Sequence, residues 1–424
     1  MREMKNSGVA WIGNIPVSWE VAKIGQLFQC RNVKVNDTDF QPLSVSKGGI
    51  VPQMENVAKS DANDNRKQVL TGDFVINSRS DRKQSCGVSK LDGSVSLINT
   101  VLYGFDKDRV IPEYNNYLLK NYGFAEEFYR WGHGIVADLW TTRWQEMKNI
   151  EIPIPSVKTQ ETILSALKIK SKNISLLIAN QEQQIEKLKQ YKQSLITEVV
   201  TKGLNPDVPM KDSGVEWIGI ISAIHNIYRL KYLLNSQMLY GANEAGSFYT
   251  NNAVRYIRIT DITEDNKLKD SSENLYLSIE KAKPYILKDK DVLFARSGAT
   301  VGKAFMYLNE YGKSAFAGYL IKAECNTQKL LPKYLFYYTQ SSLYEYWKNM
   351  IFIQATIQNI GANKYSNMPI IQMSLDEQNQ IVKFLDDKCA KIDRLIAIKQ
   401  AKIDKLNDYK KSLIYEYVTG KKEA

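Results

Sequence analysis

The chain of 424 residues is 44% hydrophobic and 24% charged and carries a formal net charge of +11, which argues against a disordered or fibrous protein and leaves room for two or more domains. The positive charge favours an anionic partner such as nucleic acid, and a lysine-rich solvated surface is the alternative. No apolar run follows the charges at the start or approaches the roughly 18 residues of a membrane span, so we expect a cytoplasmic protein without membrane attachment.

One stretch of the sequence occurs twice. IEKLKQYKQSLITEVVT at residues 185–201 returns, without a gap, as IDKLNDYKKSLIYEYVT at residues 403–419. Each copy closes one half of the chain, so the features upstream of the first copy are expected to have counterparts upstream of the second.

The first half begins with SGVAWIG at residues 7–13, which predicts an arm that docks onto another surface, with an ordinary packed turn as the alternative. LTGDFVI at residues 70–76 predicts a turn followed by a strand. The next loop, residues 77–85, is dense in side chains that reach phosphates and base edges, and a solvated loop without a partner is the alternative. A helix led by Pro112 follows, and residues 150–155 predict an extended segment.

Residues 160–201 contain neither proline nor glycine and predict one long helix that ends before Gly203. Its apolar residues recur in alternating steps of four and three, which is typical of a coiled-coil seam. At about 1.5 Å per residue this helix is roughly 60 Å long, about twice the width of a small domain, so it suits a spacer. The predicted apolar seam residues are Ile174, Ile178, Ile185, Leu188 and Leu195, with the polar Gln181 and Lys192 at seam positions between them.

The second half repeats these features in the same order. SGVEWIG occurs at residues 213–219, LKDKDVLF at 287–294 repeats the turn and strand, and a second proline-led helix begins near Pro332. Arg296-Ser297-Gly298 aligns with Arg79-Ser80, after which the first copy carries an insertion. The second long helix starts with SLDE at 374–377, which fits a capping box. Its predicted apolar seam residues are Ile392, Ile396, Ile403, Leu406 and Leu413, with Lys399 and Lys410 at the polar positions.

These elements predict an α+β protein with two globular α/β domains separated by two long helices that form an antiparallel coiled coil, related by a pseudo-twofold repeat. We expect the first globular domain at residues 1–155, a central helical spacer at 156–205, the second globular domain at 206–372 and a C-terminal helical spacer at 373–424. The two halves share a frame, which consists of the opening arm, the strand with its arginine, the proline-led helix and the long helix. Between these elements their sequences differ, over about residues 28–70 and 234–286. Two similar scaffolds with different surfaces predict recognition of a two-part target.

Recognisable catalytic groups are missing from the sequence. His133 and His225 have no acidic or histidine neighbours at metal-ligand spacing, and the four cysteines lie far apart. GATVGKA at residues 298–304 is one residue short of a phosphate-binding loop and has alanine where the magnesium-binding hydroxyl belongs. The Asn-Pro-Pro or Asp-Pro-Pro motif of adenine methyltransferases does not occur. We therefore expect no catalytic residue, no metal and no cofactor in this chain.

Several of these features together resemble one family, the specificity subunits of type I restriction-modification systems. The resemblance rests on the duplicated SGVxWIG opening, DVLFARSG at 291–298, QATIQ at 354–358 and the two glutamine-led helices, and it covers essentially the whole chain. It implies two target recognition domains that each read half of an interrupted double-stranded DNA sequence. It also implies helices that pack as an antiparallel coiled coil and fix the length of the spacer between the half-sites.

The resemblance further implies partners that carry the chemistry. These are two methyltransferase (modification) subunits, which use S-adenosylmethionine, and restriction and translocase subunits, which use ATP and magnesium. The alternatives are a self-contained DNA methyltransferase or nuclease of related organisation and a coiled-coil protein scaffold.

If the function is DNA recognition, basic and amide side chains bind phosphates and read major-groove edges. The candidate DNA contacts are Lys47, Arg79, Arg82, Lys83 and Arg143 in the first domain, and Asn243, Arg255, Arg258, Arg296, Lys303, Gln354 and Gln358 in the second.

Overall fold

The chain folds into two compact units, residues 1–182 with 400–424 (unit 1) and residues 183–399 (unit 2). The computed structural model describes residues 2–53, 65–79, 82–104, 106, 108–134, 140–248, 253–269, 273–298, 300–353 and 359–424. Two long helices, α5 (Val157–Lys202) and α10 (Leu375–Val418), each contribute one stretch to each unit. Within the described residues, no helix is long and apolar enough to cross a membrane.

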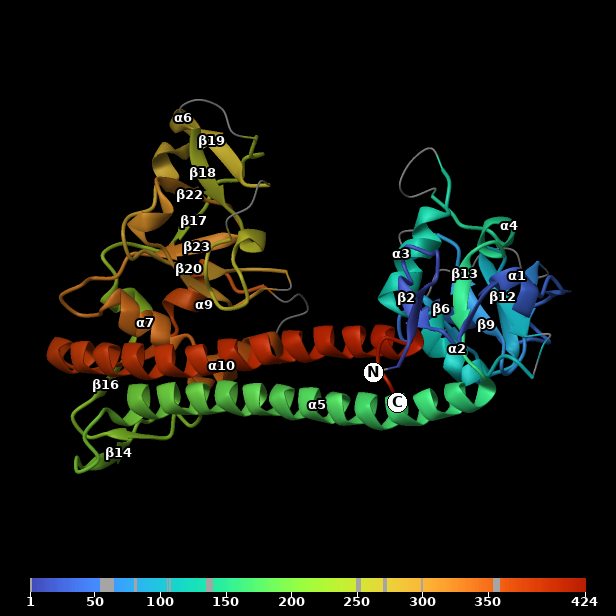
Figure 1. Cartoon of the computed structure of the whole chain (residues 1–424). Coiled ribbons are helices and arrows are strands. Elements are labelled where there is room, and N and C mark those ends of the chain that lie inside the picture. The colour runs from blue at the N-terminus through green and yellow to red at the C-terminus, as the bar shows by residue number, and fades with distance from the viewer. Residues whose placement is uncertain are drawn as a thin grey trace. The chain divides into compact units, whose positions relative to one another are not determined.

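Unit 1 combines small antiparallel sheets with short helices (Figure 1). Its N-terminal arm is the hairpin of β1 (Met4–Asn6) and β2 (Asn14–Pro16), and β3 (Glu20–Lys23) pairs with β13 (Glu151–Ile154). The main sheet has the order β10 (Cys86–Val88), β9 (Phe74–Asn77), β12 (Asn99–Gly104), β4 (Phe28–Cys30). A second sheet and a hairpin are formed by β11 (Gly93–Ser96), β8 (Arg66–Val69) and β5 (Lys34–Val35), and by β6 (Leu43–Ser46) and β7 (Gly49–Pro52). The short helices are α1 (Ile24–Leu27), α2 (Pro112–Leu118), α3 (Tyr122–Arg130) and α4 (Trp144–Met147).

Unit 2 contains the same frame. Its arm is the hairpin of β14 (Met210–Asp212) and β15 (Ile220–Ser222), and β16 (Asn226–Arg229) pairs with β24 (Pro369–Gln372). The main sheet has the order β21 (Ala304–Met306), β20 (Val292–Ala295), β23 (Leu320–Ala323), β17 (Leu239–Tyr240). Its second sheet is β19 (Leu275–Ser278), β18 (Ala253–Ile257) and β22 (Ser314–Phe316). The helices are α6 (Ile279–Ala282), α7 (Pro332–Tyr338), α8 (Ser342–Ile353) and α9 (Ala362–Ser366), with 3-10 turns at Leu230–Leu233, Ile259–Asp261, Lys283–Tyr285 and Asn309–Tyr311.

The strand registers show how closely the frames agree. In the arms, Met4 pairs with Pro16 and Met210 pairs with Ser222, so both partners are displaced along the sequence by the same offset. In the main sheets, β9 pairs with β10 and β20 pairs with β21. Ile76 pairs with Cys86, and Phe294 pairs with Ala304. Each residue of the second pair lies as far along the chain from its counterpart as residue 403 does from residue 185 in the repeated helix. The second sheets differ, because all pairs of the first are antiparallel whereas β18 and β22 run parallel. The predicted α+β class with a duplicated frame is therefore confirmed.

Each hydrophobic core is completed by the C-terminal stretch of a long helix. In unit 1, Leu413 and Tyr417 of α10 are buried, and the Tyr114 hydroxyl donates to the Val418 carbonyl at 3.4 Å. In unit 2, residues Ile196, Val199 and Val200 of α5 are buried in the core, and the hydroxyl of Tyr334 donates to the carbonyl of Val200 at 3.3 Å. The same tyrosine-to-helix contact therefore closes both cores.

Each long helix has a buried glutamine in its first turn that is bonded to the preceding segments. Gln160 accepts from the Ile111 backbone at 3.1 Å and donates to the Arg109 carbonyl at 2.7 Å. Gln378 accepts from the Leu331 backbone at 2.8 Å and donates to the Lys329 carbonyl at 2.9 Å. Both side chains belong to residues with no exposed surface, so these bonds are shielded from water. They fix the direction in which each helix leaves its globular portion.

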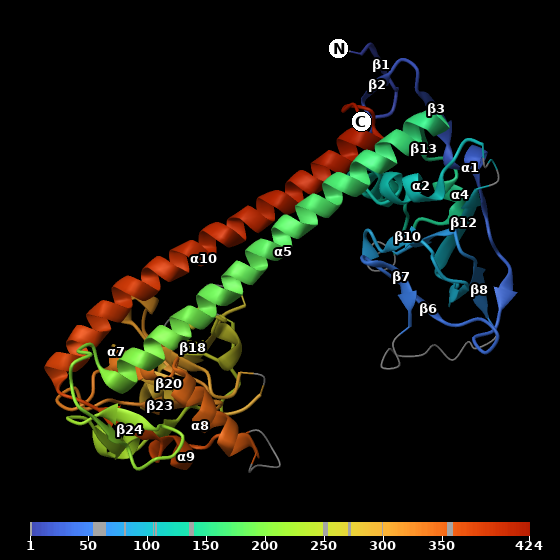
Figure 2. The same ribbon diagram turned by 90° about the horizontal axis from the view of Figure 1, so that it is seen from below.

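Within each unit the stretches of α5 and α10 run antiparallel (Figure 2). In unit 1, Lys410 Nζ donates to Ser175 Oγ at 2.8 Å and Lys170 Nζ to the Tyr417 hydroxyl at 2.5 Å. In unit 2, Lys192 Nζ binds Asp393 Oδ1 at 2.7 Å, and Lys399 donates to the side chain of Gln184. The ten predicted apolar seam residues are all buried or half-buried.

A buried aspartate organises the turn before β9 and before β20. Asp73 Oδ2 accepts from the Leu70 backbone at 2.9 Å and is bound by Arg31 Nε at 2.7 Å. The equivalent Asp291 accepts from the Lys288 backbone at 2.9 Å and lies 3.4 Å from Lys322 Nζ. Burial raises the pKa of Asp291. Each carboxylate is buried together with a cation, which is the condition under which a buried charge is tolerated.

The ion pair of Arg31 and Asp73 gives a stability prediction. Arg31→Ala leaves Asp73 buried without its cation, and the free energy of unfolding of unit 1 should fall by about 3–5 kcal/mol. Arg109→Ala removes a surface ion pair with Glu20 instead and should cost at most about 1 kcal/mol. Urea unfolding followed by circular dichroism measures both. Equal losses for the two variants would contradict this account.

Candidate nucleic-acid interface

The loops that leave β9 and β20 begin in equivalent backbone positions. The Ser78 carbonyl accepts from the Thr142 backbone at 3.0 Å, and the Arg296 carbonyl accepts from the Ile360 backbone at 2.8 Å. One residue further on, Arg79 bridges to Thr141 and Ser297 bridges to Asn359. Ile360 and Asn359 lie as far along the chain from Thr142 and Thr141 as residue 403 lies from residue 185 in the repeated helix. Arg296 is therefore equivalent to Ser78, and Ser297 to Arg79.

The alignment of Arg79 with Arg296 in the sequence is therefore wrong by one residue. An arginine follows the strand in both copies, and the insertion in the first copy allowed the two to be paired. Because successive side chains of an extended segment point to opposite sides, the two arginines use different sides of the same segment. Arg79 is exposed, whereas its neighbour Ser78 is buried.

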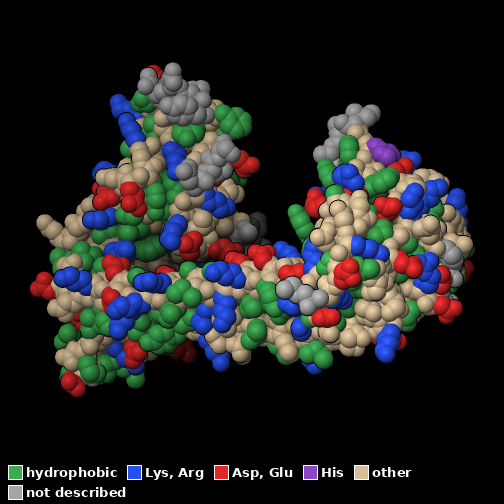
Figure 3. All heavy atoms as spheres, viewed as in Figure 1, with side chains coloured by type: hydrophobic (Ala, Val, Ile, Leu, Met, Phe, Trp, Pro, Cys, Tyr) green, Lys and Arg blue, Asp and Glu red, His purple; other side chains and the backbone are tan. Residues whose placement is uncertain are grey.

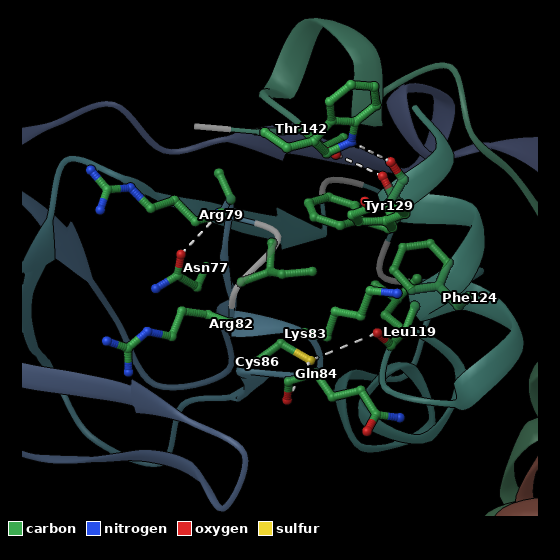
Figure 4. Close-up of a pocket in the computed structure, with 15 residues that line it drawn as sticks. Asn77, Arg79, Arg82, Lys83, Gln84, Cys86, Leu119, Phe124, Tyr129 and Thr142 are labelled. Carbon is green, nitrogen blue, oxygen red and sulfur yellow. Dashed lines mark hydrogen bonds between the residues drawn. The ribbon is translucent and has the colours of Figure 1, made fainter. Parts of the chain in front are cut away.

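In unit 1 the candidate cations around this loop separate into two groups (Figure 4). Arg79 and Arg82 are exposed and extend away from the aromatic side chains of α3. Lys83 points the other way, where its Nζ lies 4.1 Å from the centre of the Tyr129 ring and 3.1 Å from Glu126 Oε1. The charge of Lys83 is thus largely matched within the protein.

A small pocket of about 20 Å³ lies between this loop and α3. Phe124, Phe128 and Tyr129 line it together with Cys86. Burial raises the pKa of the Cys86 thiol to about 12, and that of Cys325 in unit 2 also to about 12. Both thiols are protonated near neutral pH and are poor nucleophiles.

Two further candidates of unit 1 lie at other exposed places. Lys47 is exposed in the turn between β6 and β7. Arg143 is exposed at the start of α4, where its backbone N–H donates to Glu146 Oε2 at 2.9 Å. Among the described residues, no hydrogen bond or ion pair links Lys47 or Arg143 to Arg79. Figure 3 shows Lys and Arg side chains spread among Asp and Glu over the visible face of each unit.

In unit 2, three candidate cations already bind protein groups. Arg258 Nη2 lies 2.8 Å from Asp261 Oδ1, and this carboxylate raises the pKa of Arg258. Arg255 donates to the Lys269 carbonyl, and Lys303 Nζ donates to the Thr263 carbonyl at 2.9 Å. These bonds hold the segment around the second sheet, which gives all three side chains a structural role.

Arg296 is half-buried and Asn243 is exposed, and both lie against residues 318–319 of unit 2. The Arg296 guanidinium lies 5.0 Å from the centre of the Tyr240 ring, and its backbone N–H donates to the Tyr319 carbonyl at 2.9 Å. Asn243 is exposed, and its Oδ1 occupies the space beside Gly318. Tyr240 and Tyr319, with 39% and 61% of their surface exposed, were not singled out from the sequence, because nothing local distinguishes them among 25 tyrosines. Gln354 and Gln358 lie outside the described residues.

Both histidines have acidic partners. His225 is fully buried with its Nε2 at 2.9 Å from Glu377 Oε1, and the exposed His133 lies 3.0 Å from Glu146 Oε1. These contacts join segments that are distant in sequence, so spacing alone could not reveal them. In the described ranges, no group of three or more histidine, cysteine, aspartate and glutamate side chains could hold a metal ion.

The comparisons with known proteins agree on one family. Residues 231–408 match the model of the type I restriction modification DNA specificity domain. The chain is 19% identical over 279 residues to the type I restriction enzyme StySPI specificity subunit of Salmonella potsdam, and 24% identical over 284 residues to the MjaVIII specificity subunit of Methanocaldococcus jannaschii. Residues 231–408 thus carry a type I DNA specificity domain, and the chain is similar to type I restriction enzyme specificity subunits.

The two relatives match 65% of this chain, and the chain spans about three-fifths of their length, 58% and 62%. A solved structure that addresses complex assembly and conformational transition of the type I R-M system has the same fold. It superposes with a TM-score of 0.71 over 95% of this chain and 98% of that chain, at 14% identity. The resemblance recognised in the duplicated motifs is confirmed.

Proposed function

We propose that this chain binds DNA sequence-specifically and reads an interrupted target, one half with each unit. The observation that carries the proposal is the pair of equivalent strand ends with different side chains, Ser78 in unit 1 and Arg296 in unit 2. The backbone frame is the same at both places, but unit 2 offers a guanidinium there, whereas Ser78 is buried and unit 1 offers the exposed Arg79 one residue further on. Two units with the same backbone frame but different contact residues are suited to bind two different half-sites.

The net charge of +11 supports a polyanionic ligand. A protein that neutralises several phosphates releases counterions, so its DNA affinity falls steeply as salt rises. We also propose that the chain acts in the cytoplasm. We propose that the chain is not itself an enzyme and that adenine methylation and DNA cleavage belong to its partner subunits.

Mapping of methylated adenines tests the main proposal. In cells that carry this chain and its partner subunits, the modified sites should share a two-part motif with a constant gap. Methylation of an uninterrupted motif would contradict the model of two readers. If the purified chain alone bound S-adenosylmethionine or cut DNA, an enzyme of related organisation would replace the proposal.

The exposed cations of unit 1 give a second prediction. Arg79→Ala should weaken DNA binding and reduce the slope of log affinity against log salt by about 1, because one exposed charge near the ligand is lost. Lys83→Ala is the matched control, since Glu126 already neutralises that ammonium group and the slope should stay unchanged. Fluorescence anisotropy of the assembled complex at several salt concentrations measures both. An equal change in the two variants would refute the assignment.

We further propose that the long helices hold two copies of the methyltransferase partner on matched patches. Leu177 and Tyr409 are 50% and 51% exposed in unit 1, and Tyr191 and Leu395 are 58% and 47% exposed in unit 2. When the two helices are aligned through their repeat without a gap, Leu177 matches Leu395 and Tyr191 matches Tyr409. Each patch thus has one leucine and one tyrosine from opposite helices, and apolar side chains that stay exposed at repeated positions suit a repeated partner.

Charge substitution on one patch should release one partner. Leu177→Asp should leave a complex with one methyltransferase subunit instead of two, because a carboxylate in an apolar interface is costly to desolvate. Leu176→Asp is the control, since Leu176 is 59% exposed but corresponds to Arg394 in the other copy. Native mass spectrometry counts the subunits. Retention of two partners by Leu177→Asp would overturn the assignment of the patch.

A further inference from the structure

The backbone around Arg296 is held on every side. Its own N–H donates to the Tyr319 carbonyl at 2.9 Å and its carbonyl accepts from Ile360 at 2.8 Å. The preceding Ala295 carbonyl accepts from the Tyr365 hydroxyl at 2.7 Å and from the Gly302 backbone at 2.9 Å. A side chain at this position therefore starts from a fixed point at the end of β20.

The side chain of Arg296 is oriented by an aromatic ring. Its guanidinium lies 5.0 Å from the centre of the Tyr240 ring, a distance at which a cation is attracted to the ring face. The ring itself is fixed, because the Tyr240 hydroxyl accepts from the Ala362 backbone at 2.9 Å. The ring contact leaves the terminal nitrogens of the planar guanidinium, rather than the buried Nε, to bind a ligand.

Among the described residues, none accepts a hydrogen bond from the Arg296 side chain. Its Nε is buried and has no hydrogen-bond partner, and in the part of the chain that the structure describes no carboxylate pairs with it. Arg31 and Arg258, by contrast, form short ion pairs with Asp73 and Asp261. An arginine that is stacked and backbone-anchored but left without an acceptor is arranged for an external one.

Two more buried polar atoms near this strand end have no partner. Thr300 Oγ1 follows in the same loop, and Asn359 Oδ1 belongs to the residue that bridges to Ser297. Buried polar groups in folded proteins are almost always hydrogen-bonded, so three such atoms around one segment mark a place where water or a ligand completes the bonding. Asn243, which lies against the same residues 318–319, adds an amide that can pair with a base edge.

We infer that Arg296, supported by Tyr240, reads a guanine in the half-site bound by unit 2, with its forked donors directed to O6 and N7 in the major groove. The inference rests on the proposed DNA-binding function and names the base at one position. Bidentate pairing of arginine with guanine is the commonest specific contact in protein–DNA complexes. The equivalent Ser78 of unit 1 is buried and bonded to Thr100 at 3.0 Å, so this contact is confined to one half-site.

Arg296→Lys tests the inference, because lysine keeps the charge but loses the planar fork. The recognised motif is determined for the assembled wild-type complex and the variant by selection from a randomised DNA library. The wild-type half-site of unit 2 should contain a guanine whose preference falls roughly 10- to 100-fold in the variant, while the other half-site stays unchanged. Arg79→Lys, in unit 1, is the control and should leave the unit 2 half-site intact.

Any other result contradicts either the reading of guanine by Arg296 or the proposed function. An unchanged motif in Arg296→Lys, or a wild-type half-site without guanine, would refute the reading of guanine while the proposed function stands. The inference also fails if Arg296→Ala weakens binding to all sequences equally, since that is the behaviour of a phosphate contact. A wild-type complex that selects no two-part motif would refute the proposed function itself.

Discussion

The closure of each core by the end of a long helix is the constraint on which the rest of the structure depends. Tyr114 binds the Val418 carbonyl in unit 1, and Tyr334 binds the Val200 carbonyl in unit 2. The helix end that completes unit 1 comes from the second half of the sequence, and the one that completes unit 2 comes from the first half. Neither half of the sequence can therefore bury its core alone, because burial of apolar surface is the main favourable term in folding.

This exchange explains why the repeated helix is well preserved over a long stretch without a gap. A helix end such as that of α10 must fit the seam with α5 and also the globular core around Tyr114. Two requirements on one short segment restrict its residues more than either does alone. The buried glutamines Gln160 and Gln378 place a similar restriction on the other end of each helix, since each is bonded to two segments.

The sequence predicted the features that depend on period and order. The seam spacing and the duplicated arms are local patterns, and the strand registers show how closely the arms agree. The position of Arg296 relative to Arg79 could not be derived, because one arginine after a strand looks like another until backbone bonds define the register. The ion pair between Arg258 and Asp261 is visible in the sequence as two opposite charges three residues apart. The stacking of Tyr240 on Arg296 had none, since it joins two strand ends that are distant in the sequence.

A rigid frame is what allows one changed side chain to alter a ligand preference. Ser78 and Arg296 occupy the same backbone position, fixed by bonds from Thr142 and Ile360. A substitution in a mobile loop would alter the geometry and the donors together, and the loop could compensate by moving. At a fixed position only the donors change, and a mismatch with the ligand leaves a polar group unsatisfied. The duplicated frame thus lets the two units differ in their contacts while the strands, turns and helix ends that support those contacts stay the same.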